Sequence, residues 1–196
     1  MLSVRVEALC KSYGGRAVLE NVSFEAGVGV TCLMAPSGSG KTTLLRILLG
    51  LETADSGAVY DPPARWSAVF QEDRLLEHLD AMENLRFALG RDLNEAAALE
   101  MLARLGLDGE GNKAVEDYSG GMKRRLALAR ALLARSGAVA LDEPFTGLDE
   151  ENRRACLAAV REAGEGRMVL LVTHDEADAA ALGASILRLQ SPLNNT

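Results

Sequence analysis

Residues 28–42 read V-G-V-T-C-L-M-A-P-S-G-S-G-K-T and decide the fold class of this 196-residue chain. The first seven letters form a nearly continuous apolar run, which is typical of a buried strand. A loop of small residues follows, and helix-forming residues continue from Lys41 to about Leu49, where Gly50 ends the pattern. The stretch therefore predicts a strand, a tight loop and a helix in direct succession.

The loop from Ala35 to Thr42 has the residue types that phosphate binding requires. Small residues let successive backbone N–H groups turn inward, and the helix start adds unpaired donors and a positive dipole end. Lys41 offers an ammonium group to the outer phosphates, and the Thr42 hydroxyl can bind Mg²⁺. Ala35 replaces the glycine of the strict pattern, a difference of one methyl group. We expect a nucleoside triphosphate with Mg²⁺ here, held by Ser37, Gly38, Ser39, Gly40, Lys41, Thr42 and Thr43.

A second apolar run, Ala138 to Leu141, ends in Asp142 and Glu143. A magnesium ion held by Thr42 needs a carboxylate at the end of a neighbouring strand, and Asp142 is in that position. Glu143, one residue further along, can accept a proton from an attacking water. These two carboxylates therefore predict hydrolysis of the triphosphate.

A third feature is the stretch Tyr118-Ser119-Gly120-Gly121-Met122, directly before a helix that reaches about Leu133. Ser119 is the predicted N-cap of this helix. A serine and two glycines at a helix start form a second anion site by the same dipole argument. One triphosphate does not need two such loops in one chain, so two copies of the chain could each contribute one.

The rest of the pattern predicts an α/β fold. Alternating segments at 2–9 and 17–24 predict half-exposed antiparallel strands, with a turn at Ser12–Gly15 between them. Buried strands that alternate with helices imply a mainly parallel sheet covered on both faces, interrupted by a helical insert at roughly 75–130. The other expected elements are buried strands at 66–70, 138–141 and 168–172, helices at 80–89, 94–105, 119–133 and 150–163, and a last helix and strand within 175–189.

Composition restricts the partners and the compartment. The net charge of -7 and the sequence pI of about 5.0 disfavour a nucleic-acid partner, which needs a surplus of Lys and Arg. Cys10, Cys32 and Cys156 lie far apart in apolar segments, which predicts reduced and mostly buried thiols. No apolar stretch approaches the roughly 20 residues that cross a bilayer, so a membrane role requires a partner chain.

With these loops in this order, the sequence resembles the ATP-binding subunits of ABC transporters, and the resemblance covers nearly the whole chain. The serine-glycine-glycine loop at 118–122 is the discriminating evidence, because a phosphate loop alone fits many NTPase families. The resemblance implies an α/β P-loop NTPase with a mixed, mainly parallel core sheet, an N-terminal antiparallel β subdomain and a helical signature-motif insert. It implies one ABC ATPase domain over 1–196, with a RecA-like core at about 1–74 and 136–196 and a helical subdomain at about 75–135.

The resemblance also implies roles for four further residues. Tyr13 is similar to the aromatic that stacks on adenine, and Gln71 to the Q-loop glutamine that senses Mg²⁺ and water. Asp149 belongs to a segment, 147–149, that resembles the D-loop, and His174 resembles the switch histidine that contacts the γ-phosphate. Without the resemblance, each residue also admits a simpler role. Tyr13 could be an aromatic residue of a turn and Gln71 a surface amide. Asp149 could cap a helix, and His174 could be a structural histidine.

The family pattern has leucine where this chain has Tyr118 and glutamine where it has Met122. The residues that touch the nucleotide in the family, Ser119, Gly120 and Gly121, are intact, so we expect activity. Met122 leaves the turnover rate open.

The mechanism implied by the resemblance uses two copies of the chain, arranged head to tail with two ATP molecules between them. Each ATP lies between the Lys41 loop of one copy and the Ser119 loop of the other. Glu143 polarises the water, with His174 and Gln71 fixing its geometry. The expected catalytic residues are Glu143, His174, Lys41 and Gln71, the metal-side residues are Thr42, Gln71 and Asp142, and the remaining nucleotide contacts are Tyr13, Ser119, Gly120, Gly121 and Asp149.

The implied partner is a separate membrane permease, which the stretch 71–87 would contact. The sequence of this stretch resembles the corresponding stretch in importers of nitrate, sulfonate, taurine and related small solutes. A further candidate partner is an extracytoplasmic solute-binding protein of the same system. The chain would then lie at the cytoplasmic face of the plasma membrane. The leucines of the stretch 71–87 could equally form the core of the helical insert instead of a docking surface. These residues are Leu75, Leu76, Leu79 and Leu85.

Powering solute import is the favoured function, and three alternatives remain. One is an ATPase for export or for lipid and lipoprotein extraction. Another is a regulatory ABC subunit that binds ATP with little turnover. The last is an ABC ATPase of DNA repair or translation, which the sequence disfavours because that class needs long coiled coils, zinc loops or tandem ATPase domains and this sequence shows none of them.

Overall fold

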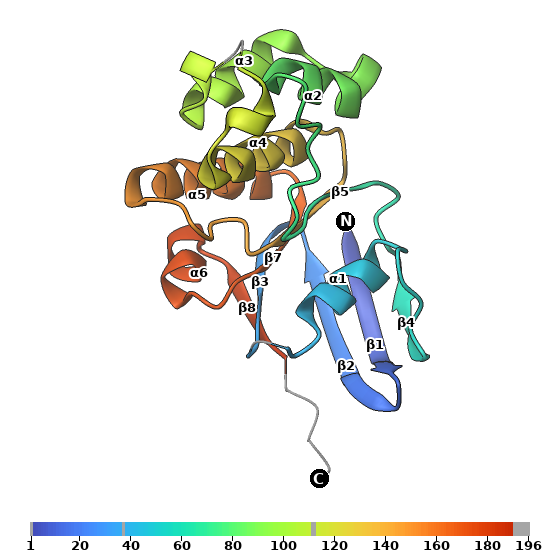
Figure 1. Ribbon diagram of the computed structural model, residues 1–196. Coiled ribbons are helices and arrows are strands. Elements are labelled where there is room, and N and C mark those ends of the chain that lie inside the picture. The colour runs from blue at the N-terminus through green and yellow to red at the C-terminus, as the bar shows by residue number, and fades with distance from the viewer. Residues whose placement is uncertain (1, 37, 111–112, 190–196) are drawn as a thin grey trace.

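The computed structural model describes residues 2–36, 38–110 and 113–189 and contains two sheets and six α-helices in these ranges (Figure 1). The strands are β1 (Ser3–Tyr13), β2 (Arg16–Gly27), β3 (Gly29–Met34), β4 (Ser56–Tyr60), β5 (Trp66–Val69), β6 (Ala138–Asp142), β7 (Met168–Val172) and β8 (Ser185–Arg188). The α-helices are α1 (Lys41–Leu48), α2 (Ala81–Leu89), α3 (Glu95–Arg104), α4 (Gly120–Leu133), α5 (Glu150–Gly164) and α6 (Glu176–Leu182). Short 3₁₀ helices cover Gly90–Asp92, Asp108–Glu110 and Val115–Asp117.

The larger sheet has five strands in the order β5-β6-β7-β3-β8, and all its pairings are parallel. Its register pairs Val69 with Leu141 and pairs Val172 with both Asp142 and Leu33. The carboxyl ends of four strands therefore reach one edge, where an open parallel sheet binds its ligands. The expected α/β fold is confirmed, and its antiparallel strands form a sheet of their own.

The buried strands send successive side chains into two different cores, one on each face of the parallel sheet. In β6, Ala138 and Ala140 join the core that contains α1 and the antiparallel sheet, whereas Val139 and Leu141 join the core that contains α4 and α5. This alternation follows from the two-residue period of a strand. It explains why the central strands β3, β6 and β7 are mainly apolar along their length, since neither face of the sheet meets water there.

The smaller sheet is antiparallel, with the order β2-β1-β4, and α1 packs between it and the parallel sheet (Figure 1). The turn predicted at Ser12–Gly15 was too long, because Ser12 still pairs with Ala17 and Tyr13 with Arg16. Gly14 and Gly15 make the whole turn with φ values of 56° and 82°, a combination that two-residue hairpins favour. Both strands consequently extend beyond the predicted ranges.

Helices α2, α3 and α4 pack together at one end of the molecule, and α4 also packs against α5 (Figure 1). A capping box fixes the start of α2, where Asp80 accepts from the Glu83 amide and Glu83 from the Asp80 amide. Leu85 is fully buried in this part of the core, whereas Phe87 is 74% exposed. Leu75, Leu76 and Leu79 are partly buried, so each of these leucines is in contact with the protein interior and also partly exposed to solvent.

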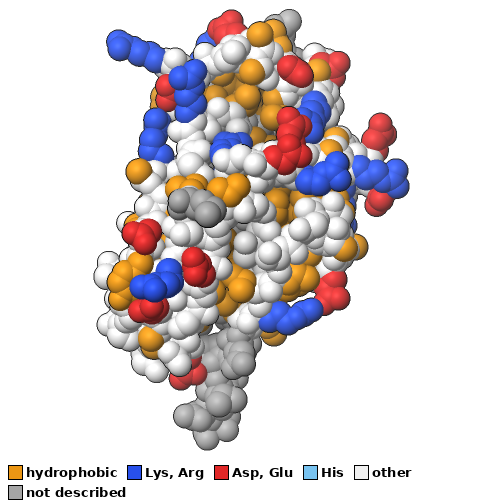
Figure 2. Space-filling view, turned by 180° about the vertical axis from the view of Figure 1, so that it is seen from behind, with side chains coloured by type: hydrophobic (Ala, Val, Ile, Leu, Met, Phe, Trp, Pro, Cys, Tyr) orange, Lys and Arg blue, Asp and Glu red, His pale blue; other side chains and the backbone are white. Residues whose placement is uncertain are grey.

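On the face seen in Figure 2, Lys and Arg side chains lie among Asp and Glu side chains, and hydrophobic side chains form separate small groups. Ion pairs on the protein surface include Arg86 with Glu95 and Arg188 with Glu176. Within the described residues, no helix combines the length and the apolar character needed to cross a bilayer.

Candidate functional site

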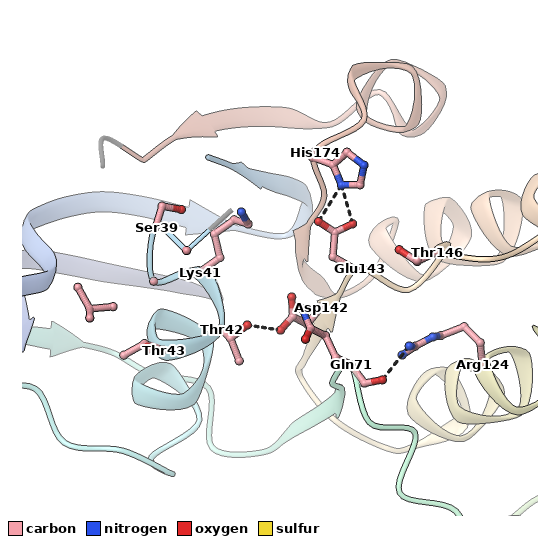
Figure 3. A pocket seen from close by; sticks show the side chains of 13 residues that line it. Ser39, Lys41, Thr42, Thr43, Gln71, Arg124, Asp142, Glu143, Thr146 and His174 are labelled. Carbon is pink, nitrogen blue, oxygen red and sulfur yellow. Dashed lines mark hydrogen bonds and ion pairs between the residues drawn. The ribbon is translucent and has the colours of Figure 1, made fainter. Parts of the chain in front are cut away.

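A cleft of about 780 Å³ opens at the carboxyl edge of the parallel sheet (Figure 3). The loops that follow β3, β5, β6 and β7 all contribute to it, as the strand register requires. Ten of the predicted site residues line it, namely Gly38, Ser39, Gly40, Lys41, Thr42, Thr43, Gln71, Asp142, Glu143 and His174. Ser37 lies outside the described residues.

The start of α1 differs from the start of every other α-helix in the described part of the chain. Its N-cap is Gly40, and no side chain accepts a hydrogen bond from its first amides. The other five helices are capped by the side chains of Asp80, Asn94, Ser119, Asp149 and Asp175. The first N–H groups of α1 have no intrahelical partner either, so they remain available to a ligand in the cleft.

Gly40 could not be replaced by a larger residue without disturbing the loop. Its φ is 82°, and a Cβ would lie 2.6 Å from the backbone oxygen of Val18. Gly38 has a φ of 78°, again in the left-handed region that glycine favours. These two glycines keep the loop close to β2 and turn its backbone toward the cleft.

Two polar groups of the loop lack the partners that buried or charged groups usually have. The Lys41 Nζ donates to the carbonyl oxygens of Ala35 (2.7 Å) and Pro36 (2.9 Å), and no carboxylate of the described residues pairs with it. Ser39 is 3% exposed, and its Oγ has no hydrogen-bond partner in the described ranges. An anion with several oxygen atoms, such as a triphosphate, would satisfy both groups.

Thr42, next to Lys41 at the start of α1, lies against Asp142 at the end of β6 (Figure 3). The Thr42 hydroxyl donates to Asp142 Oδ2 at 2.5 Å, and Asp142 is 1% exposed at the end of β6. A hydroxyl and a carboxylate are oxygen ligands of the kind Mg²⁺ prefers, and Mg²⁺ takes its remaining ligands from phosphates and water. The pair therefore fits a magnesium ion that arrives with a nucleotide.

Glu143 and His174 face each other across the ends of β6 and β7 (Figure 3). The His174 Nδ1 lies 3.0 and 3.1 Å from the two carboxylate oxygens of Glu143. This hydrogen bond and the carboxylate charge raise the pKa of His174, while Lys41 acts in the opposite direction. Glu143 has a φ of 51°, an uncommon value for a non-glycine residue, and its amide donates to the Val172 carbonyl. A proton acceptor and a titratable partner are thus held together in the cleft.

The predicted second loop does not line the cleft. Ser119 and Gly120 are exposed, and the Ser119 Oγ accepts from the Met122 amide at 3.2 Å, which confirms the predicted N-cap. A Cβ on Gly121 would lie 3.5 Å from the Leu148 side chain, so this loop is next to the D-loop-like segment. Its surface is open to a ligand from outside the chain.

Tyr13 and Asp149 also lie away from the cleft lining. Tyr13 is 46% exposed at the end of β1, and the Lys11 ammonium lies 5.2 Å from the centre of its ring. Asp149 caps α5 by accepting from the Asn152 amide at 2.9 Å, and this hydrogen bond lowers its pKa. The N-cap alternative for Asp149 is therefore confirmed.

Three lining residues were not predicted, namely Val18, Arg124 and Thr146. Arg124 reaches the cleft from α4, and its guanidinium donates to the carbonyl of Gln71 (Figure 3). The sequence did contain a signal for it, since Lys123, Arg124 and Arg125 lie near a helix start, where the dipole disfavours cations. Such a run indicates that the cations have specific partners.

Comparisons with known proteins are consistent among themselves. A family model described as "ABC transporter" matches residues 19–146. The chain is 39% identical over 192 residues to the aliphatic sulfonates import ATP-binding protein SsuB 1 of Nocardia farcinica, covering 96% of this chain and 78% of that protein. It is 34% identical to the taurine import ATP-binding protein TauB of Yersinia pestis bv. Antiqua, covering 95% and 79%. A solved structure of an ATP-binding subunit of an ABC transporter matches with a TM-score of 0.83 and 27% identity, covering 96% of this chain and 86% of the other.

Proposed function

Since this chain belongs to the ABC transporter family as one of its ATP-binding ATPase subunits, we propose that it hydrolyses Mg²⁺-bound ATP between two copies of itself and so powers import of a small solute. The single observation that carries the proposal is the cleft in which Lys41, Thr42, Asp142, Glu143 and His174 meet. No other described cavity combines an uncapped helix start, a cation without a carboxylate partner and an acid–histidine pair.

The residues of the cleft divide the work of phosphoryl transfer. Lys41 and the amides at the start of α1 hold the outer phosphates, and Thr42 and Asp142 hold the ion. Magnesium, when bound, neutralises charge that develops on the phosphate oxygens. Glu143 accepts the proton of the attacking water as it approaches the γ-phosphate. His174 and Gln71 orient that water, and such positioning, together with electrostatic stabilisation, supplies most of the catalysis in phosphoryl transfer.

A site shared between two copies accounts for the second loop. Ser119, Gly120 and Gly121 form an anion-suited helix start outside the cleft of their own chain. In a head-to-tail pair with twofold symmetry, each copy would offer this loop to the cleft of the other. Asp149 lies at the start of the neighbouring helix and would face the same interface, and Tyr13 would stack on the adenine.

The proposed partner is a membrane permease that contacts the stretch 71–87, where Phe87 is exposed. The relatives named above serve import of sulfonates and taurine, which favours import over export for this chain. An extracytoplasmic solute-binding protein would complete the system, and the chain would lie at the cytoplasmic face of the membrane. We further propose the division into a core at about 1–74 and 136–196 and a helical subdomain at about 75–135.

The experiment that tests the proposal is the substitution Glu143→Gln. It keeps the size of the side chain and removes the proton acceptor, so ATP binding should persist, turnover should fall at least about 100-fold, and a dimer should accumulate with Mg²⁺ and ATP. Phosphate release and size-exclusion chromatography measure these outcomes.

The matched control is Glu165→Gln, which removes an exposed carboxylate at the end of α5 and should keep wild-type turnover. Near-normal phosphate release by Glu143→Gln would refute the assignment of the base. A wild-type chain that never binds ATP would refute the function itself.

A further inference from the structure

Two arginines of α4 hold the segment 70–74, which lies in neither a helix nor a strand. Arg124 and Arg130 each place both terminal nitrogens on main-chain oxygens of this segment. The Arg124 Nη1 and Nη2 donate to the carbonyls of Phe70 (2.7 Å) and Gln71 (2.8 Å), and the Arg130 Nη2 and Nη1 donate to those of Asp73 (2.7 Å) and Arg74 (2.7 Å).

These contacts are unlike ordinary surface ion pairs. The Arg124 side chain is 14% exposed, and its Nη1 lies 3.1 Å from Asp73 Oδ1. Burial lowers the pKa of Arg130 and raises the pKa of Asp73, so charged groups have been removed from water on both sides of the contact. A planar guanidinium that bonds two neighbouring carbonyls fixes their relative position more firmly than a single donor would.

Arg124 thereby joins two parts of the proposed reaction. It follows the Ser119–Gly121 loop by about one helical turn, and it also lines the cleft beside Gln71 (Figure 3). A rigid displacement of helix α4 would therefore act on the Gln71 main chain through the hydrogen bonds of Arg124.

We propose that Arg124 is a positioning residue for ATP hydrolysis, which sets the place of Gln71 in the cleft and links it to the Ser119–Gly121 loop. This inference rests on the proposed function. Binding of that loop to the nucleotide of a second copy would then influence how water is oriented in the chain's own cleft. In this proposal Arg124 acts through Gln71, because its terminal nitrogens donate to the main-chain carbonyls of Phe70 and Gln71.

The test uses the full chain with the substitutions Arg124→Gln and Arg124→Lys. Arg124→Gln loses both carbonyl contacts of the fork, so kcat for ATP should fall between about 10- and 100-fold, the range expected when a group is misplaced, while KM should change less than about twofold. Arg124→Lys retains the charge but has a single donor nitrogen in place of the planar fork, so it should recover part of the loss.

The matched control is Lys123→Gln, one position earlier in α4. Lys123 carries the same charge, but it pairs with exposed Glu77 at 2.9 Å and neither lines the cleft nor bonds the segment 70–74. Its kcat should stay within about twofold of wild type. Thermal unfolding of every variant identifies any that fails to fold.

Hydrogen exchange provides a second readout that does not depend on turnover. Addition of ATP and Mg²⁺ should protect residues 66–76 in the wild type, and Arg124→Gln should lose this protection while keeping protection at 38–48. Wild-type kcat in Arg124→Gln, equal protection of 66–76, or a rise in KM with kcat unchanged would each overturn the inference. If instead the wild type failed to bind ATP, or Glu143→Gln retained turnover, the proposed function would fail.

Discussion

The starts of α1 and α4 both follow or contain a run of serine and glycine, and they differ in almost every other respect. The start of α1 has no side-chain cap, contains Lys41, and faces a cleft with Asp142 and Glu143. The start of α4 is capped by Ser119, is exposed, and lies outside that cleft. Similar local sequences have therefore produced one helix start that lines a cleft and one that is open at the surface.

The difference teaches that a helix dipole alone does not make a binding site. At α1 the unpaired amides act together with a cation and with oxygen ligands for a metal ion, so a triphosphate can be held within one chain. At α4 the serine hydroxyl already satisfies one amide, and the loop lies outside the cleft that holds Lys41, Asp142 and Glu143. A ligand there would have to be presented by another molecule, which is the role we propose for the second copy.

The largest effect expected from this comparison is on ATP affinity. Lys41→Ala removes the one ammonium group at the start of α1, and a hydrogen bond to a charged group contributes about 1.5–3 kcal/mol, so affinity should fall about 10- to 100-fold. Isothermal titration with ATP measures the change.

Arg46→Ala is the control for Lys41→Ala, because Arg46 is an exposed cation on the last turn of the same helix. It should leave ATP affinity within about twofold. Equal losses of ATP affinity in the two variants would mean that Lys41 at the start of α1 contributes no more to ATP binding than a distant surface cation.

An intermediate effect is expected at the other helix. Ser119→Ala removes the α4 cap and should lower the free energy of unfolding by about 1 kcal/mol. It should also lower turnover at least about tenfold, because the proposed site of the second copy loses a donor, while ATP binding by one chain remains unchanged. Urea unfolding and phosphate release measure the two effects separately.

Asn94→Ala separates the cap from the proposed contact. Asn94 caps α3 by accepting from the Ala97 amide at 3.2 Å, far in sequence from either loop. This variant should lose about the same stability as Ser119→Ala and keep full turnover. If Asn94→Ala lost turnover too, reduced helix stability would explain both results and the shared site would lose its support.

The sequence predicted the first site better than it predicted how the site is held. The phosphate loop and Asp142 follow from short patterns, since an apolar strand ending in a polar loop must reach one edge of the sheet. The contact of Glu143 with His174 needs the register of two strands, and that was accessible only through the family resemblance.

Arg124 and the hairpin turn were harder for different physical reasons. Arg124 bonds a carbonyl 53 positions away through a long flexible side chain, and a sequence pattern says nothing about where such a side chain ends. At the turn, propensity favoured a loop from Ser12, but pairing with Ala17 kept that residue in the strand. Tertiary pairing decided both cases.

The smallest expected effect is on the pH dependence of the free energy of unfolding. Its direction differs between the cleft and the region beside the Ser119 loop. In the cleft, Glu143 raises the pKa of His174 above its ordinary value of 6.5, so this pair stabilises the fold below that value and loses its effect as pH rises through the raised pKa. Beside the second loop, the Asn152 amide lowers the pKa of Asp149, so that contribution is present above 3.8 and is lost as pH falls through the lowered pKa.

Urea unfolding across pH, with His174→Gln and Asp149→Asn compared with wild type, measures both contributions. His174→Gln should differ from wild type at acidic pH and match it at alkaline pH, whereas Asp149→Asn should differ at neutral pH and approach wild type in acid. Because both side chains are exposed, solvent screening keeps each difference small. A proton NMR titration places the His174 pKa directly, with His78→Gln identifying the second histidine resonance. A pKa at or below 6.5 would mean that Glu143 and His174 do not pair in solution, and the cleft would lose one of the features that distinguish it from the start of α4.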